Sequence, residues 1–198
     1  GDGPMVKVTY QAPDGKGSFT TLEEPSSAFT GTRKGKWEKV TFKSTAPEDA
    51  ARAIILVRLV GGGECYWDDC HFIGEPSDGA AATANTSKVT TEKASSTVDA
   101  GPVAAPSAST ITSISEVGDG KYNLIKNGDF EIVSTNNLPT DWGLSGGKVM
   151  ENMVVSTLDP QSGKNSVRFY GDTSSIFISS IVTGFIEGEE YEFSGYIK

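Results

Sequence analysis

The two ends of this 198-residue chain constrain its fold most, because each reads as an unfinished part of a β-sheet. Residues 191–198, Tyr-Glu-Phe-Ser-Gly-Tyr-Ile-Lys, and residues 4–10, Pro-Met-Val-Lys-Val-Thr-Tyr, both have the composition of strands. We interpret the second run as the strand that follows the first in one kind of β-sandwich. A half sandwich exposes an apolar sheet face and unpaired strand edges. Residues 121–198 and 1–76 are therefore expected to complete each other, within one chain or between copies.

Short runs of β-branched and aromatic residues, separated by turn signals, occupy both of these segments. Turn signals include Pro-Asp-Gly at 13–15 and Gly-Gly-Gly at 61–63. The chain outside the linker described next is predicted to be all-β, a sandwich or jelly roll. The expected strands are 6–10, 37–42, 53–60 and 65–73, then 122–125, 149–155, 166–170, 175–181 and 191–197.

Residues 77–120 differ from both flanking segments in composition. They are rich in Ala, Ser, Thr, Val and Pro, carry scattered charges and contain no aromatic residue. This composition is typical of an extended linker between modules. We therefore divide the chain into a C-terminal half-module at 1–76, a linker at 77–120 and an N-terminal half-module at 121–198.

Net charge and hydropathy exclude two classes of partner. The formal charge is −9 and the isoelectric point is about 4.6, whereas phosphate binding draws on clustered Lys and Arg. No apolar run approaches the roughly 18 to 20 residues that a membrane span needs. We expect no nucleic acid, no membrane insertion, and a neutral or cationic partner.

Two cysteines, Cys65 and Cys70, lie in one expected strand. Five extended residues span about 16 Å, which is beyond disulfide reach, and the odd offset places the side chains on opposite faces. Two interpretations stay open: small buried hydrophobic residues, or a disulfide in a strand that bends sharply. Zinc is disfavoured because His71 is the only histidine and the spacing matches no common zinc site.

Several motifs together resemble carbohydrate-binding modules of families 4 and 9, which share a galactose-binding-like jelly roll. Residues 123–131, Asn-Leu-Ile-Lys-Asn-Gly-Asp-Phe-Glu, and 138–142, Leu-Pro-Thr-Asp-Trp, resemble the family's opening. Residues 162–167 and 188–197 resemble its next segments. Its closing strands resemble residues 35–40, 53–60 and 66–72, at the other end of this chain, with Cys70 where the family usually has an aliphatic residue.

The resemblance implies a jelly-roll β-sandwich with its two halves in permuted order. The chain could close on itself as a circular permutant, or half-domains could be exchanged between neighbouring copies in a head-to-tail assembly. A cut from a longer tandem array would give the same order.

A structural calcium ion is also implied by the resemblance. Calcium takes six to eight oxygen ligands, and family members commonly hold one where the first and last strands pair. In this chain Glu131 and one of the two aspartates, Asp68 or Asp69, would supply carboxylates, and Gly128 and Lys164 would supply carbonyl oxygens. The alternative is that the two aspartates cap turns or pair with surface lysines.

Sugar binding by such modules depends on aromatic rings that stack on pyranose rings, with polar side chains satisfying hydroxyls. Trp142, Trp37 and Phe130 are motif aromatics that we assign to the core. Strict alternation along 65–73 places Trp67 and His71 opposite Tyr66, so Trp67 is expected to be exposed. The candidate ligand-binding residues are Trp67, Tyr10, Tyr196, Tyr170 and Arg168.

We predict a non-catalytic extracellular or cell-surface module that binds a polysaccharide or surface glycan, as a repeat in a larger protein. No enzyme is expected, since no nucleophile elbow accompanies His71 and no carboxylate pair is singled out by spacing. The main alternative is a building block of an extracellular filament or surface layer, whose partners are neighbouring copies. A weaker alternative is a fragment of a multimodular glycoside hydrolase.

Overall fold

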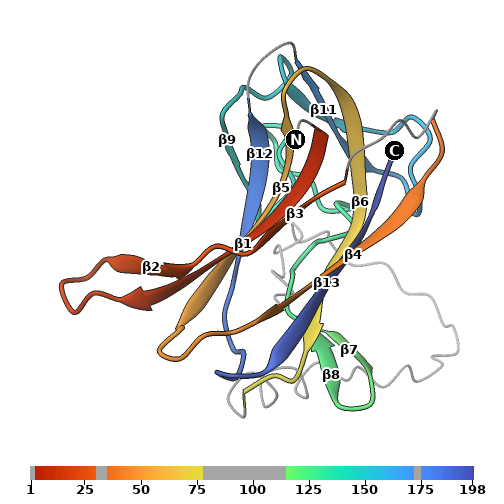
Figure 1. The fold of residues 1–198 in the computed structure, drawn as a ribbon. Helices are drawn as coiled ribbons and strands as arrows, with labels where there is room; N and C mark the ends of the chain where they lie inside the picture. The colour runs from red at the N-terminus through yellow and green to blue at the C-terminus, as the bar shows by residue number, and fades with distance from the viewer. Residues whose placement is uncertain (1–2, 30–34, 78–114, 172–174) are drawn as a thin grey trace, which may run out of the picture.

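The prediction of an all-β protein is confirmed. A computed structural model describes residues 3–29, 35–77, 115–171 and 175–198, and within these ranges it contains strands and turns but no helix (Figure 1). The described residues therefore include no helix long and apolar enough to cross a membrane. The strands form two antiparallel sheets that pack face to face as a sandwich.

The first sheet, which we call sheet A, has the strand order β2-β1-β5-β12-β9, and β3 also pairs with β1. Its strands are β1 (Gly3–Pro13), β2 (Phe19–Glu23), β3 (Ser26–Ala28), β5 (Arg52–Val60), β9 (Gly143–Ser145) and β12 (Ile176–Val182). The hairpin of β1 and β2 projects from the body of the sandwich (Figure 1), and every residue of β2 is exposed.

The second sheet, sheet B, has the order β10-β11-β6-β13-β4, and the short hairpin of β7 and β8 adds to β6. Its strands are β4 (Glu38–Thr45), β6 (Gly63–Gly74), β7 (Ser115–Gly118), β8 (Lys121–Asn123), β10 (Met153–Ser156), β11 (Ser166–Gly171) and β13 (Glu190–Ile197).

Both sheets combine strands from the two segments that the sequence separates. In sheet A, β12 pairs with β5. In sheet B, β13 lies between β6 and β4, and β11 pairs with the other edge of β6. Residues 3–76 and 121–198 therefore build one common core, and neither segment has a finished sheet of its own.

The two chain ends lie at the same end of the sandwich (Figure 1). Gly3 is opposite Val60 at the end of β5. Lys198 exchanges two main-chain hydrogen bonds with Tyr66, of 2.9 and 3.2 Å. Since only a short turn joins β5 to β6, the first and last described strands meet the same hairpin, one in each sheet.

Alternate residues of each strand enter the core, as the period of a β-strand requires. From sheet A these include Val6, Val8, Tyr10, Ile55, Val57, Ile176 and Ile178. From sheet B they include Trp67, Phe72, Val167, Phe169, Tyr191, Phe193 and Ile197. Aromatic rings dominate the sheet B side, where Phe72 and Tyr191 stack with centroids 5.3 Å apart.

A β-bulge in the middle of β6 interrupts this alternation. Ser194 of β13 pairs with His71 of β6, and Tyr196 of β13 pairs with Asp68. A step of two residues along β13 thus corresponds to three residues along β6, so β6 carries one extra residue. Asp69 adopts a positive φ of 47°, a conformation that Asp tolerates better than most residues. Before the bulge the odd-numbered residues of β6, such as Trp67, point inward, and after it the even-numbered residues, such as Phe72, do so.

The bulge explains the cysteines. Cys65 and Cys70 are both buried, both belong to the common core, and no disulfide joins them. The expectation that they lie on opposite faces is wrong, because it assumed unbroken alternation. Of the two interpretations, small buried hydrophobic residues is the one that holds. Burial raises the pKa of the Cys70 thiol well above its usual value.

Most of the predicted linker at 77–120 lies outside the described residues. At its start, the Ser77 amide donates to the Gly184 carbonyl oxygen at 2.7 Å, next to a bridge between Pro76 and Phe185. At its end, residues 115–118 form β7, which pairs with β8. The described ends of this segment are therefore joined to the sandwich by main-chain hydrogen bonds.

Candidate functional site

A cluster of aromatic and cationic side chains lies on the outer face of sheet B, near the chain ends. Tyr66 comes from β6, and Arg168, its cross-strand partner, comes from β11 together with Tyr170. Lys198 follows β13 beside Tyr66, and Trp37 directly precedes β4. We call these five residues the aromatic platform. All five are half-buried, because their neighbours on adjacent strands cover part of each side chain.

The rings of the platform are linked through the two cations. The Trp37 and Tyr66 rings meet edge to face, with centroids 6.3 Å apart. The Lys198 ammonium lies 4.4 Å from the Tyr66 centroid and 5.1 Å from that of Trp37. The Arg168 guanidinium lies 4.9 Å from the Tyr170 centroid and 5.8 Å from that of Tyr66. Each cation thus holds two rings in fixed relation.

Each platform cation also has a carboxylate partner. Arg168 donates from Nε and Nη2 to the two oxygens of Glu64, at 3.1 and 3.0 Å, which lowers the pKa of that carboxyl. Lys198 Nζ lies 3.1 Å from Asp159 Oδ2. Two cations and two carboxylates leave the platform close to neutral, and its polar groups are positioned to exchange hydrogen bonds rather than to attract one sign of charge.

The structure separates the five candidate ligand-binding residues. Arg168 and Tyr170 belong to the platform, and Tyr196 is half-buried on the outer face of the same sheet, one strand away. Tyr10 is fully buried, and its hydroxyl pairs with Ser44 at 2.9 Å, so burial raises its pKa to about 12. Tyr10 therefore faces the core and not a ligand.

Trp67 is also fully buried, and the expectation that it is exposed is wrong. Its ring lies between Phe29 and Phe193, with centroids 6.2 Å from each. The error has the same cause as that for the cysteines: the bulge shifts the phase of β6, so Trp67 points inward and Tyr66 outward. Three platform residues, Tyr66, Lys198 and Trp37, are absent from the five candidate ligand-binding residues.

The core assignments of Trp142 and Phe130 are confirmed, and that of Trp37 is wrong. Trp142 is 4% exposed and Phe130 fully buried, and their rings pack with centroids 5.3 Å apart. Trp37 instead lies on the platform, where its indole N–H donates to the Asp159 carbonyl oxygen at 3.1 Å. It precedes β4, so the alternation of that strand does not direct its side chain inward.

The motif at 123–131 is pinned to the bulge of β6. The Cys70 amide donates to the Gly128 carbonyl oxygen at 2.8 Å. A Cβ atom at Gly128 would lie 1.8 Å from the Cys70 carbonyl oxygen, so only glycine fits. Asn127 before it has a positive φ of 49° and binds the main chain of Ile132 and Thr140. The Asn-Gly pair of the motif thus has a structural role.

The residues predicted to hold calcium lie around one loop, residues 157–165 between β10 and β11. Asp68 Oδ2 accepts the amides of Gln161 and Ser162, at 2.8 and 3.3 Å. Glu131 Oε1 accepts the amides of Lys164 and Asn165, at 2.7 and 2.8 Å.

These residues fit calcium only in part. They are brought together, but the Asp68 and Glu131 oxygens that face the loop already accept N–H groups, and Asp69 accepts the Ser162 hydroxyl at 2.9 Å. In the part of the chain that the structure describes, no three His, Cys, Asp or Glu side chains are grouped to hold a metal ion. Calcium at this corner stays a prediction from the resemblance.

Asp68 is unusual because it is an ionisable residue with no exposed surface. Burial raises the pKa of its carboxyl to about 6, an effect that the amides of Ser162, Asp69 and Gln161 oppose. The three N–H groups replace the water that a surface carboxylate would bind. The Asp68 side chain is therefore held in place by three main-chain N–H groups, two of which belong to the loop.

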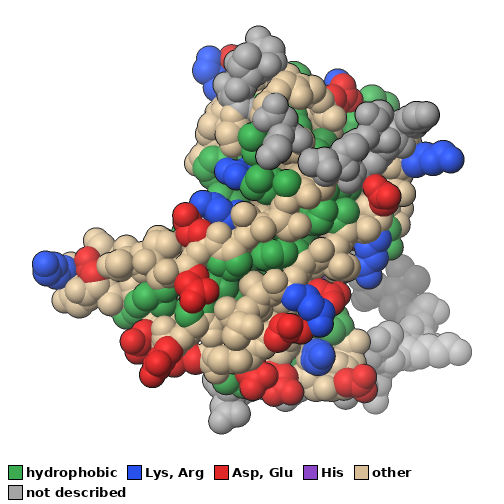
Figure 2. All heavy atoms as spheres, viewed as in Figure 1, with side chains coloured by type: hydrophobic (Ala, Val, Ile, Leu, Met, Phe, Trp, Pro, Cys, Tyr) green, Lys and Arg blue, Asp and Glu red, His purple; other side chains and the backbone are tan. Residues whose placement is uncertain are grey.

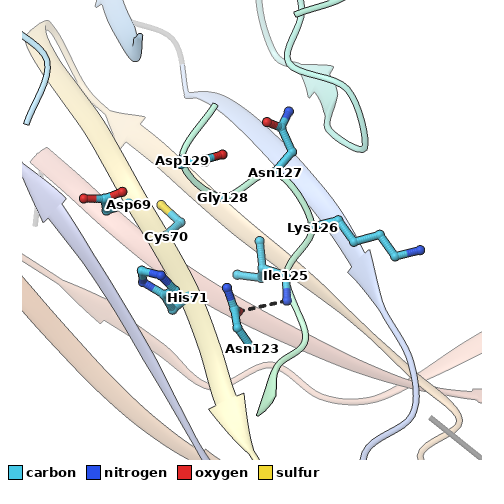
Figure 3. A pocket seen from close by; sticks show the side chains of 9 residues that line it. All are labelled: Asp69, Cys70, His71, Asn123, Ile125, Lys126, Asn127, Gly128 and Asp129. Atoms are coloured by element: carbon cyan, nitrogen blue, oxygen red, sulfur yellow. Dashed lines mark hydrogen bonds between the residues drawn. The ribbon is translucent and has the colours of Figure 1, made fainter. Parts of the chain in front are cut away.

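A polar hollow of about 250 Å³ opens beside the bulge (Figure 3). In Figure 3, Asp69 and His71 extend from β6 on one side, Asn127 and Asp129 lie above, and the Lys126 side chain points away. Asp69 and Gly128 of the predicted calcium set line this hollow. It is separate from the aromatic platform, and it places the only histidine of the chain at the protein surface.

Exposed carboxylates gather at the opposite end of the sandwich from the chain termini. Figure 2 shows acidic side chains along the lower part of the molecule, around the end of β4 and the start of β13. The exposed residues there include Glu48, Asp49, Glu187, Glu189 and Glu190. With a formal charge of −9 on the chain, this surface opposes the approach of a polyanion.

Comparison with protein-family models, with curated proteins and with solved structures finds no match to this chain.

Proposed function

We propose that this chain is a non-catalytic, extracellular or cell-surface carbohydrate-binding module, and that its glycan lies along the aromatic platform. The single observation that carries the proposal is the set of three half-exposed rings at Trp37, Tyr66 and Tyr170, gathered on one sheet face with two cations and two carboxylates between them.

The chemistry of the platform suits a sugar. Aromatic faces contact the C–H surface of a pyranose ring, and the fixed polar groups between them satisfy its hydroxyls. The rings are already held by Lys198 and Arg168, so little side-chain entropy is lost on binding. Since the cations are neutralised by Glu64 and Asp159, an uncharged polysaccharide is the ligand favoured by electrostatics.

We further propose that the sandwich is a jelly roll with its halves in permuted order, a repeat of a larger secreted protein. The position of the two chain ends supports this order: in the family's order the strand at 191–197 precedes the strand at 4–10, and here both ends meet the β5–β6 hairpin.

Binding to a panel of soluble and insoluble polysaccharides tests the function. Trp37→Ala is expected to lower the affinity for the polysaccharide that the wild type binds about tenfold or more, which corresponds to about 1.4 kcal/mol of binding free energy. The matched control is Phe19→Ala, an aromatic residue 39% exposed on the β1–β2 hairpin, far from the platform. If no polysaccharide binds, or if both variants bind equally weakly, the glycan does not lie on the platform.

A second candidate function is assembly with neighbouring copies as the unit of a filament or surface layer. The observation that favours it is the mixing of strands: without β12 and β13, residues 3–76 would leave β5, β4 and β6 with open edges. A second copy could supply the same strands in the same register. Light scattering over a range of concentrations discriminates, because exchange gives a concentration-dependent ladder and self-closure a monomer.

A further inference from the structure

The loop at residues 157–165 contacts both the aromatic platform and the carboxylates around the bulge. It joins β10 to β11, and we call it the strap. Its first part, at Asp159, reaches the platform. Its second part, at residues 161–165, reaches Asp68, Asp69 and Glu131. No other loop of the described residues is bonded to both groups by the contacts given above.

At the platform, Asp159 holds one ring and one cation together. Its carbonyl oxygen accepts the Trp37 indole N–H at 3.1 Å and lies 3.4 Å from the Lys198 ammonium. Its carboxylate lies 3.1 Å from the same ammonium. The Lys198 side chain is only 10% exposed, so this charge is enclosed by Asp159 and two rings. Moving Asp159 would therefore release both Trp37 and Lys198.

At its other part the strap is bound by carboxylates through its main chain. Asp68 and Glu131 each accept two strap amides, and hydrogen bonds from N–H to an ionised acceptor are stronger than neutral ones. The Asn165 side chain adds a bond to the Phe130 carbonyl oxygen at 3.4 Å. Asp68 itself is fixed, because its other oxygen accepts the Asp69 amide at 2.8 Å.

We propose that the strap is the positioning element of the aromatic platform, with Glu131 and Asp68 as its anchors and Asp159 as the residue that places Trp37 and Lys198. The effect of the strap on ligand affinity rests on the proposed function, whereas the positioning of Trp37 and Lys198 by the strap does not. The proposal assigns a role in binding to Glu131 and Asp68, which lie outside the platform, and makes Asp159 the link between these anchors and the rings. It also gives one physical reason for two features: the buried Asp68 carboxylate fixes the strap, and the nine-residue strap carries that support to the platform.

Tryptophan fluorescence tests the positioning without a ligand. Trp67 and Trp142 are buried, so quenching by acrylamide reports mainly on Trp37. Glu131→Ala removes the acceptor of two strap amides, whereas Glu131→Gln keeps an oxygen that can accept them. Both are measured in a chelator, so that no bound metal contributes. We expect Glu131→Ala to raise the quenching and shift the emission to longer wavelength, and Glu131→Gln to stay near the wild type.

Polysaccharide affinity of the same variants completes the test. Glu131→Ala is expected to bind about tenfold more weakly, about 1.4 kcal/mol, and Glu131→Gln to restore binding. Glu190→Ala, an exposed carboxylate on β13, is the matched control. If Glu131→Ala fails to fold, Ser162→Ala takes its place, because it removes the hydrogen bond from the strap to Asp69 and leaves both anchors intact. A smaller change in the same direction is expected.

Two results are distinguishable. If the wild type binds a polysaccharide but Glu131→Ala and Ser162→Ala change neither the quenching nor the affinity, the strap does not position the platform. If quenching responds as expected while the wild type binds no polysaccharide, the positioning holds and the proposed function fails.

Discussion

The two halves of β6, before and after its bulge, have similar sequences but serve different surfaces. Before the bulge, Cys65 and Trp67 face the core and Tyr66 faces outward onto the platform. After it, Cys70 and Phe72 face the core and His71 faces outward beside the polar hollow. One extra residue therefore sets which side chains are buried in each half, and hence which side chains each half presents on its outer surface. The predictions below each disturb one half or the bulge between them.

The largest effect is expected at the pin that holds the bulge. Gly128→Ala would place a Cβ atom 1.8 Å from the Cys70 carbonyl oxygen, which neither main chain can avoid without moving. We expect a loss of about 3 kcal/mol of unfolding free energy, or failure to fold, at the upper end of overpacking. Urea unfolding measures it.

The control for this prediction is Gly143→Ala. A Cβ atom there would meet its nearest neighbour, the Ser179 hydroxyl, at an ordinary 3.8 Å. Equal stability of the two variants would mean that the 123–131 motif does not pin the bulge.

The next effect concerns the charge of Asp68. Burial raises the pKa of Asp68 from 3.8 to about 6 in the folded state. At a pH between these two values, the Asp68 carboxyl is therefore protonated in the folded protein and ionised in the unfolded chain. The contribution of Asp68 to stability is therefore largest near pH 4, falls as the pH rises to about 6, and is constant above it. At about 1.4 kcal/mol for each pH unit, the fall amounts to no more than about 3 kcal/mol.

The measurement is the difference in unfolding free energy between the wild type and Asp68→Asn across this range. Taking this difference cancels the contributions of other carboxyls to the pH dependence of stability. Glu64 is one of them: Arg168 lowers its pKa, so its contribution changes with pH in the opposite direction. A difference that does not vary between pH 4 and 6 would contradict the raised pKa.

Calcium would act at the bulge itself. If the ion predicted from the resemblance binds through Asp69 and Glu131, calcium at a hundred times its Kd raises the unfolding free energy by about 2.7 kcal/mol. Thermal unfolding with calcium or a chelator measures the change. Asp69→Asn is expected to abolish it and Glu190→Gln to leave it intact. If millimolar calcium does not change the unfolding temperature, the prediction of a structural calcium ion is wrong.

Much of the fold follows from the sequence because strands and turns are local signals. The runs at 53–60 and 191–197 form strands close to their expected bounds, the run at 6–10 lies inside the longer β1, and the expected sharing of one core by the two segments is found. Pairing partners were harder to assign than strands. They depend on contacts between residues far apart in the chain, which a resemblance can suggest but periodicity cannot.

The candidate site was predicted less well, and the reason lies in a few residues. Strict alternation through Asp68 and Asp69 placed Trp67 outside and Tyr66 inside, the reverse of what is found. A signal was present: apolar residues at 65 and 67 and again at 70 and 72 change phase across two adjacent aspartates, as a bulge would require. Nothing local indicated that Trp37 would reach Asp159, because 122 positions separate them.

The smallest effect on stability, and the sharpest contrast in binding, is expected from the outward residues of the two halves. Tyr66 contacts both platform cations, with Lys198 4.4 Å and Arg168 5.8 Å from its ring centroid, whereas His71 lies beside the separate hollow. Tyr66→Ala should weaken polysaccharide binding about tenfold, about 1.4 kcal/mol, and His71→Ala should leave it unchanged.

Tyr66→Phe separates stacking from hydrogen bonding in the same half of β6. It keeps the ring and both cation contacts and removes only the hydroxyl, so it should bind much more tightly than Tyr66→Ala. Affinity electrophoresis in a polysaccharide gel ranks the three variants on folded protein. If His71→Ala weakens binding as much as Tyr66→Ala does, the ligand lies across the bulge and the hollow, and the division of β6 into a binding half and a structural half is wrong.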